Sequence, residues 1–264
     1  MDQFKHNEHD VPLDQHKVVS PDEWVAARKA LLAREKMHTR AGDELNRQRR
    51  ALPWVKIDKT YLFDTPSGKK TLAELFEGRS QLIVYHFMFG PGWEEGCGGC
   101  SFLSDHIDGA NLHLAHHDVK MLAVSRAPLA ELLPFKKRMG WAFDWVSSFG
   151  SDFNYDFHVS ATQDEIANGK TYYNYEMTEG APGGELPGIS VFFKNSTGEI
   201  FHTYSSYGRG GDILIGAHNY LDLTPKGRNE HEIMDWVRHH DRYEDQPSVA
   251  KPDETPLPGG SCCG

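Results

Sequence analysis

The chain has 264 residues, a formal net charge of −10 and a mean hydropathy of −0.58. Hydrophobic residues make up 39% of it, so the composition excludes wholesale disorder, and the length allows one large domain or two small ones. No apolar run approaches the ~18 residues of a membrane helix, the first residues lack the apolar segment of a signal peptide, and the pI of 5.8 argues against nucleic acid as a partner. We therefore expect a cytoplasmic protein with neither a membrane nor a nucleic-acid partner.

The beginning of the chain predicts a flexible end followed by a long helix. Residues 1–19 are polar, and Ser20-Pro21-Asp22-Glu23 then combines an N-cap serine, a first-turn proline and the glutamate of a capping box. The next residues are rich in Ala, Leu, Glu, Lys and Arg, which predicts a helix as far as about Arg50 that Gly42 could interrupt. Residues 20–52 are therefore expected to form a helical arm.

The middle of the chain predicts short strands that alternate with helices. Residues 54–63 alternate as a short pair of strands would, and residues 65–68 have the composition of a turn. A nearly all-apolar run at 82–89 predicts a buried strand, and apolar residues recur at helical spacing from Leu103 onward. The other elements expected here are a helical segment at 72–76, a strand at 119–124, a helix at 128–139 and a strand at 141–146.

An aromatic insertion and a hairpin follow. Residues 150–186 contain many aromatic side chains but no regular pattern, so we expect irregular structure there. Asn195-Ser196-Thr197-Gly198 lies between two runs rich in β-forming residues, which predicts a hairpin. Its strands are expected at 189–193 and 200–204.

The end of the chain predicts two helices and a flexible tail. The helices are expected at 213–221 and 229–244, the second of them solvated, and the proline-rich residues 245–264 indicate a flexible tail. The order of all these elements places one sheet between two layers of helices. We therefore predict an α/β fold with a single domain at 20–244, whose core spans about 54–223.

Cys97-Gly98-Gly99-Cys100 lies between the predicted buried strand and the helix behind it. The two sulfurs would then be one helical turn apart and could close a disulfide with little movement. A helix N-terminus stabilises a thiolate on Cys97, and Cys100 could attack a mixed disulfide formed there. The pattern predicts reversible dithiol–disulfide exchange, with Cys97 as the nucleophile and Cys100 as the resolving thiol. A pair of ordinary core cysteines is the alternative.

Four side chains could act on the dicysteine or its substrate. Glu94 and Glu95 directly precede the motif, and their negative charge would raise the pKa of a thiol. Arg126 follows the strand 119–124 and would lower that pKa if this strand is parallel to 82–89, so that both end at one rim of the sheet. A surface arginine without such a role is the alternative. Trp93 could contact a substrate, together with Glu94 and Glu95, or simply pack. The net direction of the pKa shift stays open.

The run from Tyr85 to Phe102, YHFMFGPGWEEGCGGCSF, resembles an uncharacterised, mainly bacterial domain-of-unknown-function family of predicted dithiol–disulfide oxidoreductases. Gly140-Trp141 to Phe157 and Thr224-Pro225-Lys226-Gly227-Arg228 resemble it too, so the resemblance covers about residues 20–245. It implies a thioredoxin-like three-layer sandwich with an N-terminal helical extension and an aromatic insertion. Dithiol–disulfide exchange at Cys97 and Cys100 would have a protein or small-molecule disulfide as the partner, and we expect no cofactor and no metal.

The wider thioredoxin superfamily implies one more site residue. Pro187 precedes the predicted hairpin where that superfamily carries a cis-proline opposite the dicysteine, so we expect a cis Leu186–Pro187 bond and a role in shaping the substrate groove. The aromatic insertion ends there and could cover the site, pack on the core or form the surface of a homodimer. The chain departs from thioredoxins because Trp93 stands four residues before Cys97 and the Gly-Gly spacer lacks the common proline.

Other functions remain open. The cysteines could bind or deliver a metal, although His113 and His117 would lie ~20 Å along a helix from Cys100 and make a weak site. A thiol peroxidase is less favoured, because Glu94 stands where peroxiredoxins place a Thr or Ser before the reactive cysteine. A redox-inert binding protein is the last alternative.

Cys262 and Cys263 lie on the predicted flexible tail. Adjacent Cα atoms are ~3.8 Å apart, below the usual disulfide range, so a bond between these two cysteines would be strained. A tail of this length has a typical end-to-end distance of about 25 Å and could reach Cys97 of the same chain or of a neighbour. The ending resembles the dithiol tails of some flavoprotein reductases, including mercuric reductases, which implies a resolving or delivery role. A disordered tail whose thiols are incidental is the alternative.

If the tail has that role, oxidation should produce a mixed disulfide between Cys97 and Cys262 or Cys263. Mass spectrometry of the trapped, digested protein would identify the linked peptides. Oxidised protein without any such species would contradict a role for the tail.

Overall fold

The computed structural model of the protein describes residues 11–179 and 184–243. Its helices are α1 (Pro21–Arg50), α2 (Leu72–Leu75), α3 (Gly98–Ser104), α4 (Ile107–His116), α5 (Leu129–Arg138), α6 (Phe153–Asp156), α7 (Gln163–Asn168) and α8 (Gly216–Leu221), with 3-10 turns η1 (Leu13–Gln15), η2 (Gly208–Leu214) and η3 (His240–Arg242). Its strands are β1 (Val55–Lys56), β2 (Leu62–Thr65), β3 (Gly68–Thr71), β4 (Gln81–His86), β5 (Val119–Ser125), β6 (Trp145–Ser147), β7 (Lys170–Tyr173), β8 (Glu176–Glu179), β9 (Gly188–Lys194) and β10 (Ile200–Tyr207).

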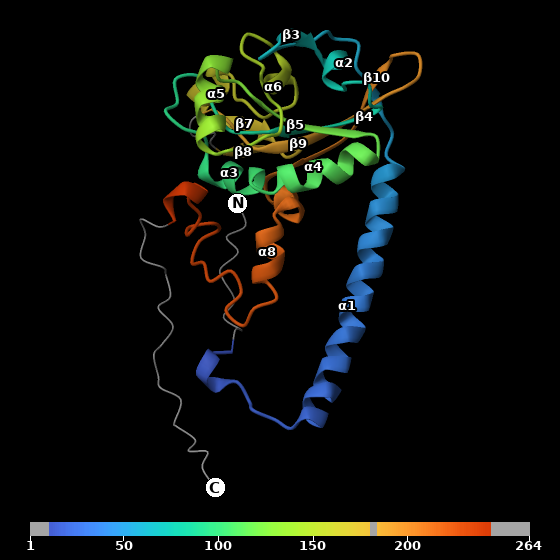
Figure 1. The fold of residues 1–264 in the computed structure, drawn as a ribbon, viewed down its shortest axis with the longest axis vertical. Helices are drawn as coiled ribbons and strands as arrows, with labels where there is room; N and C mark the ends of the chain where they lie inside the picture. Colours follow the sequence, from blue (N-terminus) through green and yellow to red (C-terminus); the bar gives the residue numbers. More distant parts are fainter. Residues whose placement is uncertain (1–10, 180–183, 244–264) are drawn as a thin grey trace.

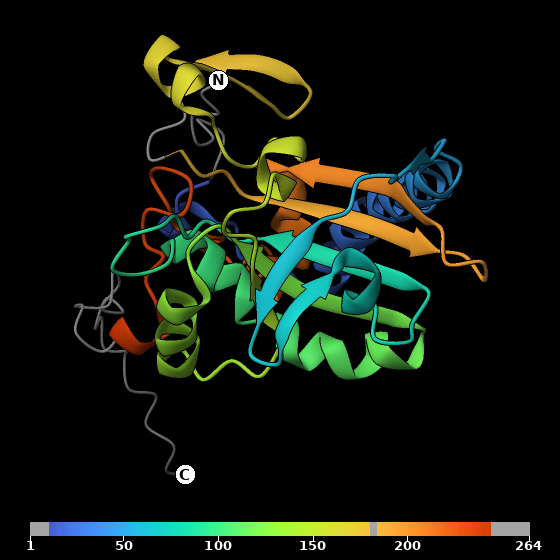
Figure 2. The same cartoon turned by 90° about the horizontal axis from the view of Figure 1, so that it is seen from above.

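One eight-stranded sheet organises the fold, in the order β1-β10-β9-β4-β5-β6-β2-β3. Strands β4, β5 and β6 are parallel, whereas β9 is antiparallel to β4 and β10 is antiparallel to β9 (Figure 2). The crossover from β4 to β5 carries α3 and α4. A parallel pair joined through helices and flanked by an antiparallel hairpin is the thioredoxin-like arrangement, so the predicted fold class is confirmed.

The central strands bury both of their faces, as their nearly continuous apolar sequence predicted. Successive side chains of a strand point to opposite faces, so Leu82 and Val84 of β4 enter one core while Ile83 and Tyr85 enter the other. Helices α3, α4 and α5 contribute side chains to the core that holds Tyr85, and α2 and α6 contribute to the opposite one. Figure 1 shows α3 and α4 below the strands and α2 and α6 above them. The sheet is therefore the middle layer of three, and Tyr85 faces the layer that carries the dicysteine.

Helix α1 begins and ends where the sequence predicted. The Ser20 hydroxyl accepts the Glu23 N–H at 3.3 Å, and the Glu23 carboxylate accepts the Ser20 N–H at 3.0 Å, which forms the expected capping box. Gly42 does not interrupt the helix. No residue of α1 is buried, and Figure 1 shows it extending away from the sheet as an arm. Within the described residues, no helix is long and apolar enough to cross a membrane.

Several elements differ from the sequence prediction. The expected strand pair at 54–63 is absent, because β1 pairs with β10 and β2 pairs with β3. The insertion 150–186 is not irregular where it is described: it holds α6, α7 and the β7–β8 hairpin, which stands off one end of the main sheet (Figure 2). The sequence did contain local signals for α7, since Thr162 and Glu165 form a capping box and Gly169 ends the helix in a left-handed conformation.

The solvated helix predicted at 229–244 is wrong for the described residues up to 243. This segment consists of turns and η3, with Val237 and His239 buried. Side chains here form hydrogen bonds with backbone groups that would otherwise pair with each other in a helix. The Asp235 carboxylate accepts hydrogen bonds from two backbone N–H groups, and the Arg238 guanidinium donates to two backbone carbonyls. The burial of Val237 and His239, together with these hydrogen bonds, stabilises the segment in a form other than a helix.

We expect Phe87→Ala to cost about 3–5 kcal/mol of the free energy of unfolding, because it leaves a cavity among packed aromatic rings. Phe87 is 1% exposed and its ring lies 4.5–6.4 Å from those of Phe135, Trp141 and Trp145. Urea unfolding measures the loss. Leu112→Ala in α4 is the matched control, since Leu112 is 69% exposed; equal losses for both variants would contradict this account of the core.

Candidate functional site

The dicysteine lies at the junction between β4 and α3. Cys97 is the N-cap residue of α3, as predicted, and its backbone N–H donates to the Met88 carbonyl at 3.2 Å. The Met88 N–H donates in turn to Cys100 Sγ at 3.5 Å. The backbone of one residue just beyond β4 therefore contacts both cysteines and fixes their place against the end of the strand.

A glycine directly before the motif lets the loop pack closely. A Cβ on Gly96 would come within 2.6 Å of the Phe87 ring and 2.9 Å of the Phe135 ring, which no side chain can do without displacing them. The Gly96 carbonyl is bound by His239 Nε2 at 2.9 Å. The absence of a side chain at Gly96 thus lets the loop before the dicysteine pack directly against the aromatic core.

The two thiols have opposite properties. The pKa of Cys97 is lowered to about 6, chiefly by a hydrogen bond from the Cys100 side chain and further by the backbone N–H groups of Cys100 and Gly99, against the opposing effect of burial. The pKa of Cys100 is raised well above its ordinary value, first by its burial and then by Cys97. With a pKa of about 6, Cys97 is a thiolate near neutral pH and Cys100 is the thiol that donates to it. The sequence left the direction of this pKa shift open.

Tyr85 is a site residue that sequence reasoning missed. It is 3% exposed, its pKa is raised by burial, and its hydroxyl lies within hydrogen-bonding reach of Cys100. This hydrogen bond, with that from the Met88 N–H, favours the thiolate form of Cys100. The signal was available, because strand alternation places Tyr85 on the face of β4 that carries α3.

The dicysteine opens onto a cavity of about 290 Å³. Cys97, Cys100 and Pro187 all line it, so the structure brings together the two predicted cysteines and the predicted proline. Pro187 directly precedes β9, and its neighbour Gly188 pairs with His86 at the end of the adjacent strand β4. The remaining lining residues are Tyr85, Met88, Gly99, Leu103, Gly188, Ile189, Ser206, Gly208, Arg209, Gly211, Asp212, Ile215, Ile233 and Met234.

The predicted cis Leu186–Pro187 bond is wrong: it is trans, like every other peptide bond among the described residues. Hydrogen bonds on both sides hold the segment in this form. The Leu186 N–H donates to the Val159 carbonyl at 2.8 Å, and the Pro187 carbonyl accepts the Tyr173 hydroxyl at 2.7 Å. An X–Pro peptide bond is ordinarily trans, and these two hydrogen bonds are compatible with the trans form.

Arg126 does not act on Cys97 as predicted. Its guanidinium forms an ion pair of 2.6 Å with Glu185 and lies over the Tyr155 ring. Glu185 is 1% exposed and also accepts the Ser160 hydroxyl at 2.6 Å, while burial raises the pKa of its carboxyl. The groups that lower the pKa of Cys97 are Cys100 and backbone N–H groups instead. The Arg126–Glu185 pair therefore joins the end of β5 to the segment that leads to Pro187.

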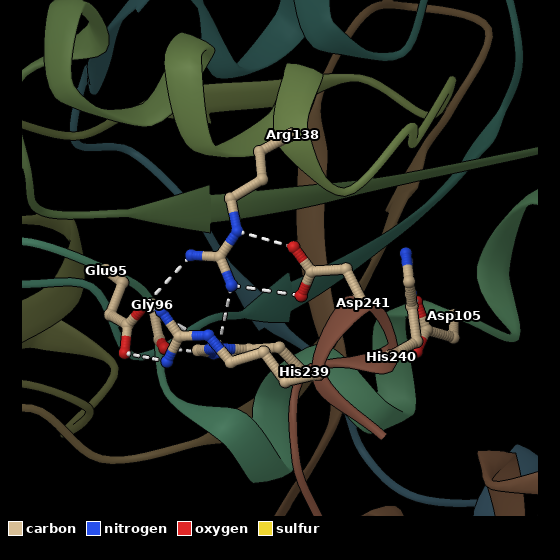
Figure 3. A network of polar contacts seen from close by, with 8 residues as sticks. Glu95, Gly96, Asp105, Arg138, His239, His240 and Asp241 are labelled. Carbon is tan, nitrogen blue, oxygen red and sulfur yellow. Dashed lines mark hydrogen bonds and ion pairs between the residues drawn. The ribbon is translucent and has the colours of Figure 1, made fainter. Parts of the chain in front are cut away.

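Glu95 is part of an ion network rather than a free charge beside the thiol (Figure 3). Arg138 and Arg242 both pair with it, at 2.9 and 2.7 Å, and Arg138 also pairs with Asp241 at 2.7 Å. These cations hold the pKa of the Glu95 carboxyl below its ordinary value. Because its charge is balanced, Glu95 does not raise the pKa of Cys97 as its position in the sequence suggested.

The other predicted residues lie farther from the sulfur chemistry. Trp93 packs partly buried against the aromatic core, its indole within 3.0–3.2 Å of where a Gly90 Cβ would stand, and Glu94 is exposed. His113 and His117 are exposed on and just after α4. Among the described residues, no three His, Cys, Asp or Glu side chains form a group that could hold a metal. Cys262 and Cys263 lie outside the described residues.

A sheet of this topology, with a Cys-x-x-Cys at the start of the helix after β4, defines a thioredoxin-like protein. The chain belongs to the family described as "Bacterial protein of unknown function (DUF899)", whose model matches residues 13–243. No curated protein matches the sequence significantly.

Solved structures with some similarity come from several bacteria. Peroxiredoxin Q of Xanthomonas campestris is 15% identical, with a TM-score of 0.39 over 63% of this chain and 94% of that chain. Peroxidoxin BcpB of Mycobacterium tuberculosis is 9% identical, with a TM-score of 0.37 over 62% and 93%. A candidate thiol:disulfide interchange protein DsbE of Chlorobium tepidum is 11% identical, with a TM-score of 0.37 over 63% and 97%.

Only a thiolate is alkylated, so the rate of Cys97 alkylation by iodoacetamide should rise with pH and reach half its plateau near pH 6. Cys100→Ala removes the donor that lowers the pKa most and should move the midpoint to higher pH. Cys100→Ser keeps a hydroxyl donor and should move it less. A wild-type midpoint near 9, or no shift in Cys100→Ala, would contradict the hydrogen bond between the two sulfurs.

Proposed function

We propose that the protein is a dithiol–disulfide oxidoreductase of the bacterial cytoplasm. The observation that carries this proposal is the pairing of two unlike thiols at one cavity: a thiolate at Cys97 and a buried, protonated thiol at Cys100. Exchange needs a nucleophilic thiolate that the substrate can reach and a second thiol that attacks only afterwards. This pair has both properties.

The reaction would proceed in two displacements. The Cys97 thiolate attacks one sulfur of a substrate disulfide, a mixed disulfide forms, and the first substrate thiolate leaves and takes a proton. Bonding at Cys97 removes its negative charge, so Cys100 loses the acceptor of its S–H hydrogen bond. The Tyr85 hydroxyl and the Met88 N–H then stabilise the Cys100 thiolate as it attacks Cys97 and releases the second substrate thiolate.

The remaining predicted residues act on the substrate rather than on the sulfur chemistry. Pro187 would shape the wall of the groove opposite the cysteines, and Arg126 would hold that wall in place through Glu185. The two thiols carry both electrons, so the proposed reaction uses no bound cofactor. The partner is a molecule that bears a disulfide, and cytoplasmic reductants would regenerate the dithiol.

We expect Cys97 and Cys100 to form a reversible two-electron couple. The protein with Cys262→Ser and Cys263→Ser keeps only these two of its four cysteines. Equilibrated with mixtures of reduced and oxidised glutathione, it should lose both free thiols together. Adding Cys100→Ser should leave a stable glutathione adduct on Cys97, because the resolving thiol is gone, and adding Cys97→Ser should abolish the reaction. Mass spectrometry after acid quenching reads out each species.

A Cys97–Cys100 disulfide that never forms across the range of glutathione ratios would refute the oxidoreductase. A metal-binding protein would instead retain stoichiometric zinc or copper after purification and lose it in both cysteine variants. A thiol peroxidase would consume peroxide continuously when a reductant is supplied, and Cys97→Ser would abolish that consumption.

A further inference from the structure

The residues 229–243, here called the C-terminal cover, pack beside the dicysteine instead of forming a helix. Within the cover, the Met234 sulfur lies 3.3 Å from the position of a Cβ on Gly99, the residue between the two cysteines. Met234 has a φ of +60°, a left-handed conformation that is unfavourable for such a side chain, and its N–H donates to the Glu230 carboxylate at 2.8 Å. Surrounding contacts therefore hold the thioether against the motif.

An ion network clamps the cover to the loop that leads into Cys97 (Figure 3). Arg242 donates two hydrogen bonds to Glu95, at 2.9 and 2.7 Å, and Arg138 of α5 joins Glu95 to Asp241. His239 is 6% exposed and binds the Gly96 carbonyl. The cover is thus tied to both residues that directly precede Cys97.

The cavity between the cover and the dicysteine is small and apolar. Its volume of about 290 Å³ lies just below the range of about 300–1,000 Å³ for small-molecule sites, so it suits a small ligand. Leu103, Ile189 and Ile215 line it from the body of the protein, and Ile233 and Met234 line it from the cover. Besides the Cys97 thiolate, the charged side chains among the described lining residues are Arg209 and Asp212, which pair with each other at 3.0 Å. Among these residues, no unpaired cation is present to select an anionic ligand.

We propose that this cavity binds a small disulfide with uncharged aliphatic arms, and that the C-terminal cover keeps folded proteins from the dicysteine. The inference rests on the proposed oxidoreductase function and names its substrate class. One arm of the disulfide lies among the isoleucines and the methionine, which places the nearer sulfur at Cys97. Burial of an aliphatic arm supplies binding free energy in proportion to its length, because each methylene leaves water.

The exchange balances within the two partners. The Cys97–Cys100 dithiol is oxidised to a disulfide, and one dialkyl disulfide is reduced to two alkanethiols. One new sulfur–sulfur bond forms in the protein as one breaks in the substrate. The Cys100 proton passes to one product thiolate, and the other product thiolate takes its proton from water.

The test is the rate of Cys97–Cys100 disulfide formation with dimethyl, diethyl, di-n-propyl and di-n-butyl disulfide. The Cys262→Ser, Cys263→Ser protein is used, and each rate is divided by the rate of the same disulfide with dithiothreitol, which removes differences in intrinsic reactivity. We expect the ratio to rise by up to about fourfold for each methylene added per arm until the cavity is full. Oxidised glutathione and insulin, which are charged or bulky, should react more slowly than the dibutyl compound.

A matched pair of variants locates the effect. Ile233→Lys places a charge at the cavity and should flatten the dependence on chain length. Ile213→Lys makes the same change at a residue that does not line the cavity, and it should keep the dependence. Both isoleucines are well exposed, 53% and 67%, so neither change disturbs the core.

The outcomes separate this inference from the function on which it rests. A disulfide that forms with every reagent but with no dependence on arm length, or fastest with glutathione or insulin, would overturn the substrate class and leave the oxidoreductase standing. A dithiol that none of these reagents and not even diamide can oxidise would overturn both.

Discussion

Both cysteines depend on the backbone of Met88. Its carbonyl accepts the Cys97 N–H and its N–H donates to Cys100 Sγ, so the end of β4 and the start of α3 are joined at the reacting atoms. This places Cys97 at the helix terminus, partly accessible, and Cys100 one turn deeper, 2% exposed. The difference in burial then gives the two sulfurs different pKa values. The deeper Cys100 thiol stays protonated and donates a hydrogen bond to the Cys97 thiolate.

The sheet places Tyr85 and Pro187 at the site, the first through the alternation of side chains along β4 and the second through the pairing register of β9 with β4. Tyr85 reaches Cys100 because it lies on the α3 face of β4, whereas its neighbour Val84 enters the opposite core. Pro187 reaches the same place from a distant part of the sequence, because antiparallel pairing sets Gly188 opposite His86. A shift of one residue in the pairing of β9 with β4 would move Pro187 out of the wall of the cavity.

Patterns among neighbouring residues predicted much of this structure. The features that the sequence did not predict depend on contacts between residues far apart in the chain. The capping box of α1, the hairpin of β9 and β10 and the position of Cys97 follow from neighbours in the sequence. The trans bond at Pro187 depends on Val159 and Tyr173, and the pairing of Arg126 depends on Glu185, which the sequence could not place beside them. The cover has the composition of a helix, but buried contacts of His239 and hydrogen bonds of its own side chains to the backbone override that preference.

The acidic residues before the motif show how far adjacency in sequence can mislead. Glu95 stands two residues from Cys97, and as a free charge it would oppose the thiolate. In the fold its carboxylate is neutralised by Arg138 and Arg242, so it anchors the cover while hydrogen bonds within the motif set the pKa of Cys97. Reactivity and access are therefore controlled by separate groups. A change in the clamp can alter which molecules reach the thiolate without altering how readily that thiolate forms.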